Sequence, residues 1–154
     1  MGNKIIASHS IDIALPVEQC LMLFTPAGEE LWAEGWSPQY LFPQDGNTTR
    51  GMVFTTGKNE EYTVWVMTEF TRNPYFVRYA RVTPNSRWGF VDVRCEAVSE
   101  YLTSATVRYY IQAFDSAEEG VLKDFEAQAF TGMITEWKTR IDSHLDILKT
   151  SLIR

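Results

Sequence analysis

The 154-residue chain carries a formal net charge of -6, and its 14 Lys and Arg residues are scattered along the sequence. Nucleic acids and anionic membrane surfaces are bound through clustered Lys and Arg, so this distribution excludes both as partners. No apolar run approaches the roughly 20 residues that cross a bilayer, and the N-terminus does not resemble a signal peptide. We therefore expect one domain spanning residues 1–154, without membrane insertion, in the cytoplasm.

The first residues predict a strand that leads into a short helix. Ile11, Ile13 and Leu15 alternate with polar or small residues, which is typical of a half-buried strand, here placed over residues 5–15. Pro16 ends the strand and suits the first helical position, because its fixed φ and missing N–H cost nothing there. The apolar residues that follow share one face of the helix: Val17, Cys20, Leu21 and Phe24.

A second short helix is predicted directly afterwards. Thr25 supplies a hydroxyl cap and Pro26 the first helical position, and we expect the helix to end within residues 32–35. Three carboxylates crowd this helix, and the helix dipole and solubility are sufficient to explain them: Glu29, Glu30 and Glu34.

Six further strands are predicted in the middle of the chain. Segments rich in β-branched and aromatic residues alternate with turn signals such as Gly57-Lys58-Asn59 and Asn73-Pro74. Turns this short join antiparallel neighbours, so all seven strands are expected in one antiparallel sheet. The additional strands are placed over residues 40–42, 52–56, 62–70, 75–83, 88–99 and 102–114.

The end of the sequence predicts one long amphipathic helix. Ser116 and Glu119 have the S-x-x-E spacing of a capping box, so we place the helix start at Ser116. Gly132 lies in the middle of this helix, where it permits a bend. Apolar residues recur at three- and four-residue steps along one face: Leu122, Phe125, Ala129, Met133, Trp137, Ile141, Leu145, Leu148 and Leu152. A curved sheet that buries its face by gripping this helix leaves a pocket between them.

This order of elements, with two local motifs, resembles a known superfamily. The segment FTPAGEELWAEGWSP from Phe24 to Pro38 and the segment GMVFTT from Gly51 to Thr56 are similar to START-like or Bet v 1-like (SRPBCC) proteins, in a bacterial branch related to polyketide cyclase/dehydrase-like proteins. The resemblance covers essentially the whole chain. It implies an α+β helix-grip fold, in which a seven-stranded curved antiparallel sheet surrounds a long C-terminal helix, with two short helices after the first strand (β-α-α-β6-α). It also implies a deep cavity for apolar or amphipathic ligands such as lipids, sterols and aromatic polyketides.

Aromatic residues make up 14% of the chain, and two interpretations compete for them. One is a cavity lined by rings whose hydroxyl and N–H groups orient a ligand; the other is core filling with an aromatic outer sheet face. Trp32 and Trp36 favour the cavity, because a loop beside a helix end has less reason to bury two indoles. The candidate ligand-binding residues are Trp32, Trp36, Tyr40, Phe54, Trp65, Tyr79, Tyr109, Phe125, Ala129, Met133, Glu136 and Arg140.

The charged candidates on the last helix leave one question open. Glu136 and Arg140 are four residues apart, so they form either a partly buried pair that meets a polar group of the ligand or an exposed surface pair. The sequence does not decide between these positions. The arginines of the strands are expected to face solvent for the most part: Arg78, Arg94 and Arg108.

The sequence contains no catalytic or metal-binding motif. His9 and His144 are its two histidines, and it has no HxxxH, Cys/His cluster or GxSxG. We therefore expect no metal and no cofactor, and the catalytic residues, if the protein is an enzyme, stay unassigned. Cys20 and Cys95 lack CxxC spacing and are expected as buried free thiols rather than a disulfide.

The resulting hypothesis is the binding of a small hydrophobic or aromatic molecule between sheet and C-terminal helix, for transport or sequestration. The first alternative is a polyketide cyclase- or dehydratase-like enzyme, which an ionisable side chain deep in the cavity would favour. The second is a chaperone-activator-like interaction module, with a filled core and an exposed apolar patch. Whether the protein is an enzyme stays open, and a homodimer is compatible with the sequence.

Overall fold

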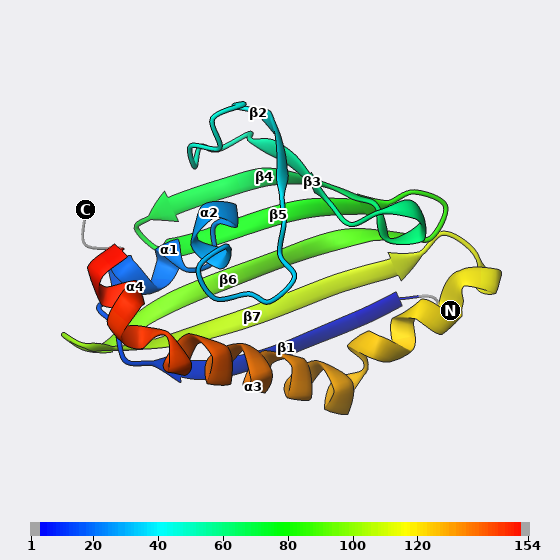
Figure 1. Ribbon diagram of the computed structural model, residues 1–154. Helices are drawn as coiled ribbons and strands as arrows, with labels where there is room; N and C mark the ends of the chain where they lie inside the picture. The colour runs from blue at the N-terminus through cyan, green and yellow to red at the C-terminus, as the bar shows by residue number, and fades with distance from the viewer. Residues whose placement is uncertain (1–3, 152–154) are drawn as a thin grey trace.

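The computed structural model describes residues 4–151 as a curved sheet with helices on its concave side (Figure 1). The chain begins with β1 (Lys4–Ile13), α1 (Val17–Met22) and α2 (Pro26–Glu29). The further strands are β2 (Gln39–Phe42), β3 (Val53–Thr56), β4 (Thr63–Arg72), β5 (Tyr75–Thr83), β6 (Arg87–Ser99) and β7 (Leu102–Ala113), with a short 3-10 turn, η1 (Asn59–Glu61), before β4. This confirms the predicted seven-stranded antiparallel sheet with two short helices after its first strand.

The strand order explains how the chain encloses a space. The sheet runs β1-β7-β6-β5-β4-β3-β2, so the first strand pairs with the last one and lies at the opposite edge from the second. The segment from α1 to residue 38 must therefore cross the concave face from one edge to the other (Figure 1). This crossing segment carries the residues that later meet the C-terminal helix.

The turn between α1 and α2 is held by side-chain capping and by a glycine. Thr25 accepts a hydrogen bond from the Gly28 N–H at 3.0 Å and donates one to the Met22 carbonyl at 2.8 Å. A Cβ atom at Gly28 would lie 1.8 Å from the Met22 oxygen, so only glycine permits this approach. The helix ends at Glu29, earlier than predicted, and the chain continues in hydrogen-bonded turns such as Ala33 N–H to Glu29 carbonyl, 2.8 Å.

The C-terminal helix is interrupted, so the prediction of one continuous helix was wrong. Residues Ser116–Phe125 form a 3-10 helix, η2, followed by α3 (Ala127–Ser143) and α4 (Leu145–Ser151). The breaks lie at Glu126, whose backbone is extended (φ -70°, ψ 160°), and at His144, rather than at Gly132. The capping box is not formed either: Asp115 is the cap, and its side chain accepts from the Glu118 N–H.

The break at Glu126 has a packing reason. Phe125 and Phe130 are both buried, yet five residues on an α-helix rotate a side chain by about 500°, some 140° away from the starting face. The extended backbone of Glu126 changes the rotation between Phe125 and Phe130, so that both rings point into the core. The buried face of α3 is consequently made by Phe130, Ile134 and Ile141, and Ala129, which we expected on this face, is exposed. The predicted Leu152 lies outside the described residues.

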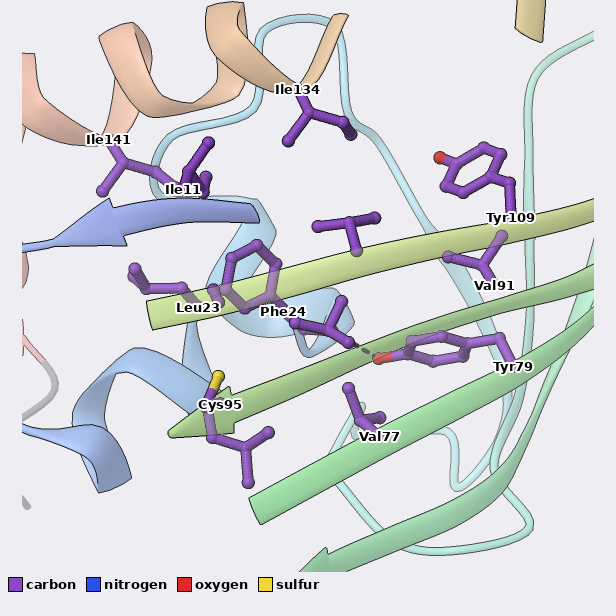
Figure 2. Close-up of a cluster of buried hydrophobic side chains, with 14 of the residues drawn as sticks. Ile11, Leu23, Phe24, Val77, Tyr79, Val91, Cys95, Tyr109, Ile134 and Ile141 are labelled. Atoms are coloured by element: carbon purple, nitrogen blue, oxygen red, sulfur yellow. Dashed lines mark hydrogen bonds between the residues drawn. The ribbon is translucent and has the colours of Figure 1, made fainter. Parts of the chain in front are cut away.

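The core lies between the concave sheet and the helices, as Figure 2 shows for residues of β5, β6, β7, α3 and the α1–α2 turn. Cys20 and Cys95 are buried free cysteines, and Cys95 donates a weak hydrogen bond to Cys20 with a sulfur separation of 3.9 Å. At the edge strand, the Lys138 ammonium of α3 donates to the Asp12 carbonyl of β1 at 2.7 Å. These contacts fix α1 and α3 relative to the sheet.

Candidate ligand-binding cavity

A cavity of about 310 Å³ lies between the sheet, the crossing segment and α3. This volume is at the lower end of the range for small-molecule sites, roughly 300–1,000 Å³. The crossing segment contributes Phe24, Glu29, Trp32, Ala33, Glu34, Gly35 and Trp36. The sheet contributes Phe54, Trp65, Tyr79, Arg81, Val91, Val93 and Tyr109, and the C-terminal region Phe125, Met133 and Trp137.

The structure brings together most of the residues proposed from the sequence. Those that line the cavity are Trp32, Trp36, Phe54, Trp65, Tyr79, Tyr109, Phe125 and Met133. Tyr40 does not line the cavity; it is the register neighbour of Phe54 on β2, with ring centroids 6.4 Å apart, and its hydroxyl donates to Glu30 at 2.8 Å. Ala129 is excluded from the cavity by the re-phasing of α3. The structure does not place Glu136 and Arg140 on the cavity wall.

Four aromatic rings form one wall of the cavity, which we call the aromatic wall. Phe54 and Trp65 are register neighbours on β3 and β4, and their rings stack with an interplanar angle of 3° and centroids 5.8 Å apart. Tyr79 stands at 89° and 90° to them, with both centroid distances at 6.0 Å. Trp36 packs edge-on against the same pair at 5.9 Å. The wall therefore has a fixed aromatic geometry before any ligand arrives.

Three tryptophans that line the cavity use their indole N–H groups in hydrogen bonds within the protein. Trp32 donates to the Leu23 carbonyl at 2.9 Å, and Trp36 donates to the Pro26 carbonyl at 3.0 Å. Trp65 donates to the Thr56 hydroxyl at 2.9 Å. We expected such N–H groups to orient a ligand, but these three orient the rings themselves. What they offer to a ligand is the face or edge of the ring.

Glu29 is an acidic group inside the cavity. It is the last residue of α2, partly buried, and burial raises its carboxyl pKa to about 8, so the protonated form dominates at neutral pH. Among residues 4–151 we find no ion-pair or hydrogen-bond partner for this carboxyl. The attribution of Glu29 to helix dipole and solubility was therefore wrong. The signal that could have found it is its place on the segment that crosses the concave face.

Arg81 is a basic group in the same cavity and was missed in the sequence. The residue is 7% exposed, and burial lowers the pKa of its guanidinium to about 10, so it is charged at neutral pH. Its Cζ lies 4.8 Å from the Trp65 ring centroid, and its Nη2 donates to the Thr83 hydroxyl at 3.2 Å. Strand parity could have found it, because Arg81 follows Tyr79 by two residues on β5 and so shares its face.

Tyr109 completes the polar set. Burial raises the pKa of its hydroxyl to about 12, and the ring packs 5.1 Å from Phe130 and 5.7 Å from Phe125. In the described part of the chain, its hydroxyl has no hydrogen-bond partner, whereas the Tyr79 hydroxyl donates to a backbone carbonyl (Figure 2). Glu29, Arg81 and Tyr109 are thus titratable side chains of the cavity with hydrogen-bonding capacity left for a ligand.

A smaller groove of about 210 Å³ lies beside the cavity and contains Glu136 and Arg140. Arg140 forms ion pairs with Glu34 of the crossing segment and with Glu136 of its own helix. The hydrogen bond from Arg140 lowers the pKa of the Glu34 carboxyl. The guanidinium already has two carboxylate partners, so it links the crossing segment to α3 at the rim of the cavity.

A second group of aromatic residues lies on the convex face of the sheet. Trp88, Phe90 and Tyr110 pack together there, with centroids 6.2 to 6.5 Å apart. The guanidinium of Arg78 lies 4.5 Å over the Phe90 ring, and Arg108 pairs with Asp92 at 2.8 Å. Arg94 and Arg108 are exposed and Arg78 is half-buried, so the expectation that most of these three arginines face solvent is confirmed. Aromatic rings thus lie on both faces of the sheet: one group lines the cavity and another lies on the convex outer face.

Neither a metal-binding cluster nor a membrane-spanning helix is present in the described residues. Residues 4–151 contain no group of three or more His, Cys, Asp or Glu side chains that could hold a metal ion. Within the same residues, no helix combines the length and the apolar character needed to cross a bilayer.

The comparisons with known proteins identify the fold. No family model and no curated protein matches the sequence. A hypothetical protein from Helicobacter pylori superposes with a TM-score of 0.70 at 7% identity, covering 91% of this chain and 87% of that one. A norcoclaurine synthase mutant from Thalictrum flavum, in complex with a transition state analogue, gives 0.63 at 6% identity and covers 92% and 96%. An Hsp90 activator from Plasmodium falciparum gives 0.56 at 12% identity and covers 96% of each chain.

Identities this low show the fold alone. The chain has the helix-grip fold of the START-like or Bet v 1-like superfamily, as the sequence resemblance implied. Proteins on this fold include an enzyme and a chaperone activator, so the fold does not select one function.

Proposed function

We propose that this protein binds a small, flat hydrophobic or aromatic molecule in the cavity, for transport or sequestration. The observation that carries the proposal is the preformed aromatic wall of Phe54, Trp65 and Tyr79 facing a cavity of about 310 Å³. Ring faces that are already oriented bind a flat ligand without losing further side-chain entropy. Location in the cytoplasm and a homodimeric state stay predictions.

Calorimetric titration with 2-naphthol, a neutral two-ring probe, tests this function. Trp36 is half-buried on the cavity wall, so Trp36→Ala should weaken binding by about tenfold or more. Trp88→Ala is the matched control, because Trp88 is also half-buried but lies on the convex face. Equal affinities of the two variants and the parent, with unchanged stability, would contradict a site in the cavity.

A specific observation favours enzymatic proton transfer as a second candidate function. A carboxyl with a pKa of about 8 inside an aromatic cavity is poised to exchange a proton near neutral pH, and Glu29 is such a group. A guanidinium and a free phenol in the same cavity, from Arg81 and Tyr109, are suited to stabilise an oxyanion. The chemistry that fits is removal of a proton next to a carbonyl of an aryl ketone.

The second candidate is tested with 2-acetylnaphthalene in D₂O. Ionised Glu29 would take a methyl proton, and the resulting enolate would regain a deuteron, so the methyl signal in the proton spectrum would decay faster than in buffer. Glu29→Gln should return the exchange rate to that of buffer. An unaccelerated rate with the parent protein would leave binding alone as the function. The chaperone-activator alternative requires a filled core, which the cavity does not favour.

A further inference from the structure

We propose that the ligand is an aromatic carboxylate whose anionic oxygens are bound by Arg81. The inference rests on the proposed function, since it concerns the same cavity, and it names the chemistry that the polar end of the cavity selects.

Arg81 is a buried cation on which the Glu61 carboxylate acts only from beyond ion-pair distance. A buried charge is normally paired, because its removal from water is costly. No carboxylate lies within 4.0 Å of Arg81 in the part of the chain that the structure describes. Arg87, two register rows away on β6 and buried to a similar extent at 6% exposure, has the Glu61 carboxylate at 2.8 Å and the Ser86 hydroxyl at 3.1 Å. The protein therefore supplies a carboxylate to Arg87, whereas Arg81 lines the cavity without one.

The hydrogen-bonding capacity of Arg81 is also mostly unused. A guanidinium has five N–H donors, and the Nη2 contact to Thr83 uses one of them. The Nε of Arg81 is buried and has no partner. Thr83 is itself held by the Thr63 hydroxyl at 2.7 Å, so it is a fixed structural contact. A planar fork of this kind binds the two oxygens of a carboxylate in parallel.

The neighbours of Arg81 in the sheet place its guanidinium beside the aromatic wall. Its register neighbour on β6 is Gly89, where a side chain would collide with the Tyr110 oxygen 1.8 Å from the Cβ position. On the β4 side, Trp65 carries the guanidinium on its ring and stacks against Phe54. An aryl ring that packs against this wall therefore brings a directly attached carboxylate close to the guanidinium.

The charge balance of the cavity points the same way. Glu29 is protonated at neutral pH, and Glu34 is paired with Arg140 at the rim. Of the Asp, Glu, Lys and Arg side chains that line the cavity, Arg81 is the one that is charged at neutral pH without an ion-pair partner in the described residues. An anionic ligand restores neutrality, whereas a cationic aromatic ligand is repelled.

Paired titrations with 2-naphthoate and 2-naphthamide at pH 7 test the inference, because the two probes differ mainly in charge. The parent protein should bind 2-naphthoate about tenfold or more tightly than 2-naphthamide. Arg81→Gln should remove this preference and leave the affinity for 2-naphthamide within about threefold. Arg78→Gln is the matched control: Arg78 also lies on β5 over an aromatic ring with an unpartnered Nε, but on the convex face.

The outcomes separate this inference from the proposed function. If neither probe nor 2-naphthol binds, the proposed function fails. If the parent binds both naphthyl probes equally, or if Arg81→Gln weakens both to the same extent, Arg81 only supports Trp65 and the inference is overturned. If circular dichroism shows that Arg81→Gln is unfolded, Arg81→Lys, which keeps the charge, replaces it. The test is then whether the parent protein and Arg81→Lys both prefer 2-naphthoate to 2-naphthamide.

Discussion

The hydroxyl of Tyr79 donates a hydrogen bond of 2.6 Å to the backbone carbonyl of Phe24, which joins the middle of β5 to the turn between α1 and α2 (Figure 2). Both residues are buried, and both line the cavity. The contact holds the crossing segment above the sheet at the height of the aromatic wall. The shape of the cavity thus depends on one side-chain hydrogen bond between elements that are 55 residues apart.

Removing this hydrogen bond should destabilise the fold. Tyr79→Phe leaves the Phe24 carbonyl buried without its donor, so we expect the free energy of unfolding to fall by about 1 to 3 kcal/mol. Urea denaturation measures this change. Tyr110→Phe is the control, since the Tyr110 hydroxyl makes a contact of 3.4 Å with Gln112 on the convex face. Equal losses in both variants would mean that the bond to Phe24 has no special importance.

The raised pKa of Glu29 should appear in the pH dependence of stability. A carboxyl whose pKa rises from 4.5 in the unfolded chain to about 8 in the folded protein binds its proton more tightly when folded. Its contribution is therefore full below pH 4.5 and is lost as the pH rises towards and through 8. A shift of this size corresponds to about 3 to 5 kcal/mol.

Glu29→Gln isolates this contribution, because glutamine has the same shape and does not titrate. Relative to the variant, the parent should lose stability between pH 5 and 8.5, as measured by urea denaturation at each pH. Tyr40, Tyr79 and Tyr109 interact electrostatically with Glu29 across the same space. The pKa values of all three hydroxyls are raised, that of Tyr109 to about 12, so these groups do not titrate in this window. Parallel stability profiles for parent and variant would show that Glu29 is not buried in solution.

Arg140 should contribute little to recognition of a carboxylate. Its guanidinium already binds Glu34 and Glu136 at the rim, so Arg140→Leu should change the affinity for 2-naphthoate by less than about threefold. Calorimetric titration checks this expectation, with Arg81→Gln as the positive control. A tenfold loss of affinity for 2-naphthoate in Arg140→Leu would show that the anion is bound at the rim of the cavity and not at Arg81.

The two cysteines should be unreactive in the folded protein. The hydrogen bond from Cys95, followed by burial, raises the pKa of the Cys20 thiol well above its ordinary value, and the thiolate is the reactive form. With Ellman's reagent at pH 8, we expect no rapid reaction in buffer and two reacting thiols in urea. Cys20→Ala should reduce the count in urea to one. A thiol that reacts promptly in the native state would contradict the packing of α1 on β6.

Alternation along the strands was sufficient to predict the sheet and much of its aromatic wall. Trp65 and Tyr79 lie inward because residues of one parity share one face, and this signal is local. The interruption at Glu126 was beyond such reasoning, because helical periodicity describes one element and not the sheet against which it packs. Phe125 and Phe130 satisfy the core only together, and their five-residue spacing has no meaning until the sheet is placed.

The ionisable residues of the cavity were missed for a different reason. Glu29 and Arg81 each have an adequate local explanation, a helix terminus for the first and a solvated strand for the second. Their function as cavity residues depends on the crossing of the concave face, which follows from the pairing of β1 with β7. A charged residue is therefore better judged by the element that lies opposite it than by its neighbours in sequence.

The distribution of tryptophan gives the protein a built-in optical reporter. Of its five tryptophans, Trp32, Trp36, Trp65 and Trp137 line the cavity, and Trp88 lies on the convex face. In a Trp88→Phe variant, all tryptophan fluorescence would come from residues that line the cavity. A change in the wavelength or intensity of this fluorescence would therefore report ligand binding without any label. Fractions of cell extracts could then be screened for the natural ligand by this fluorescence change.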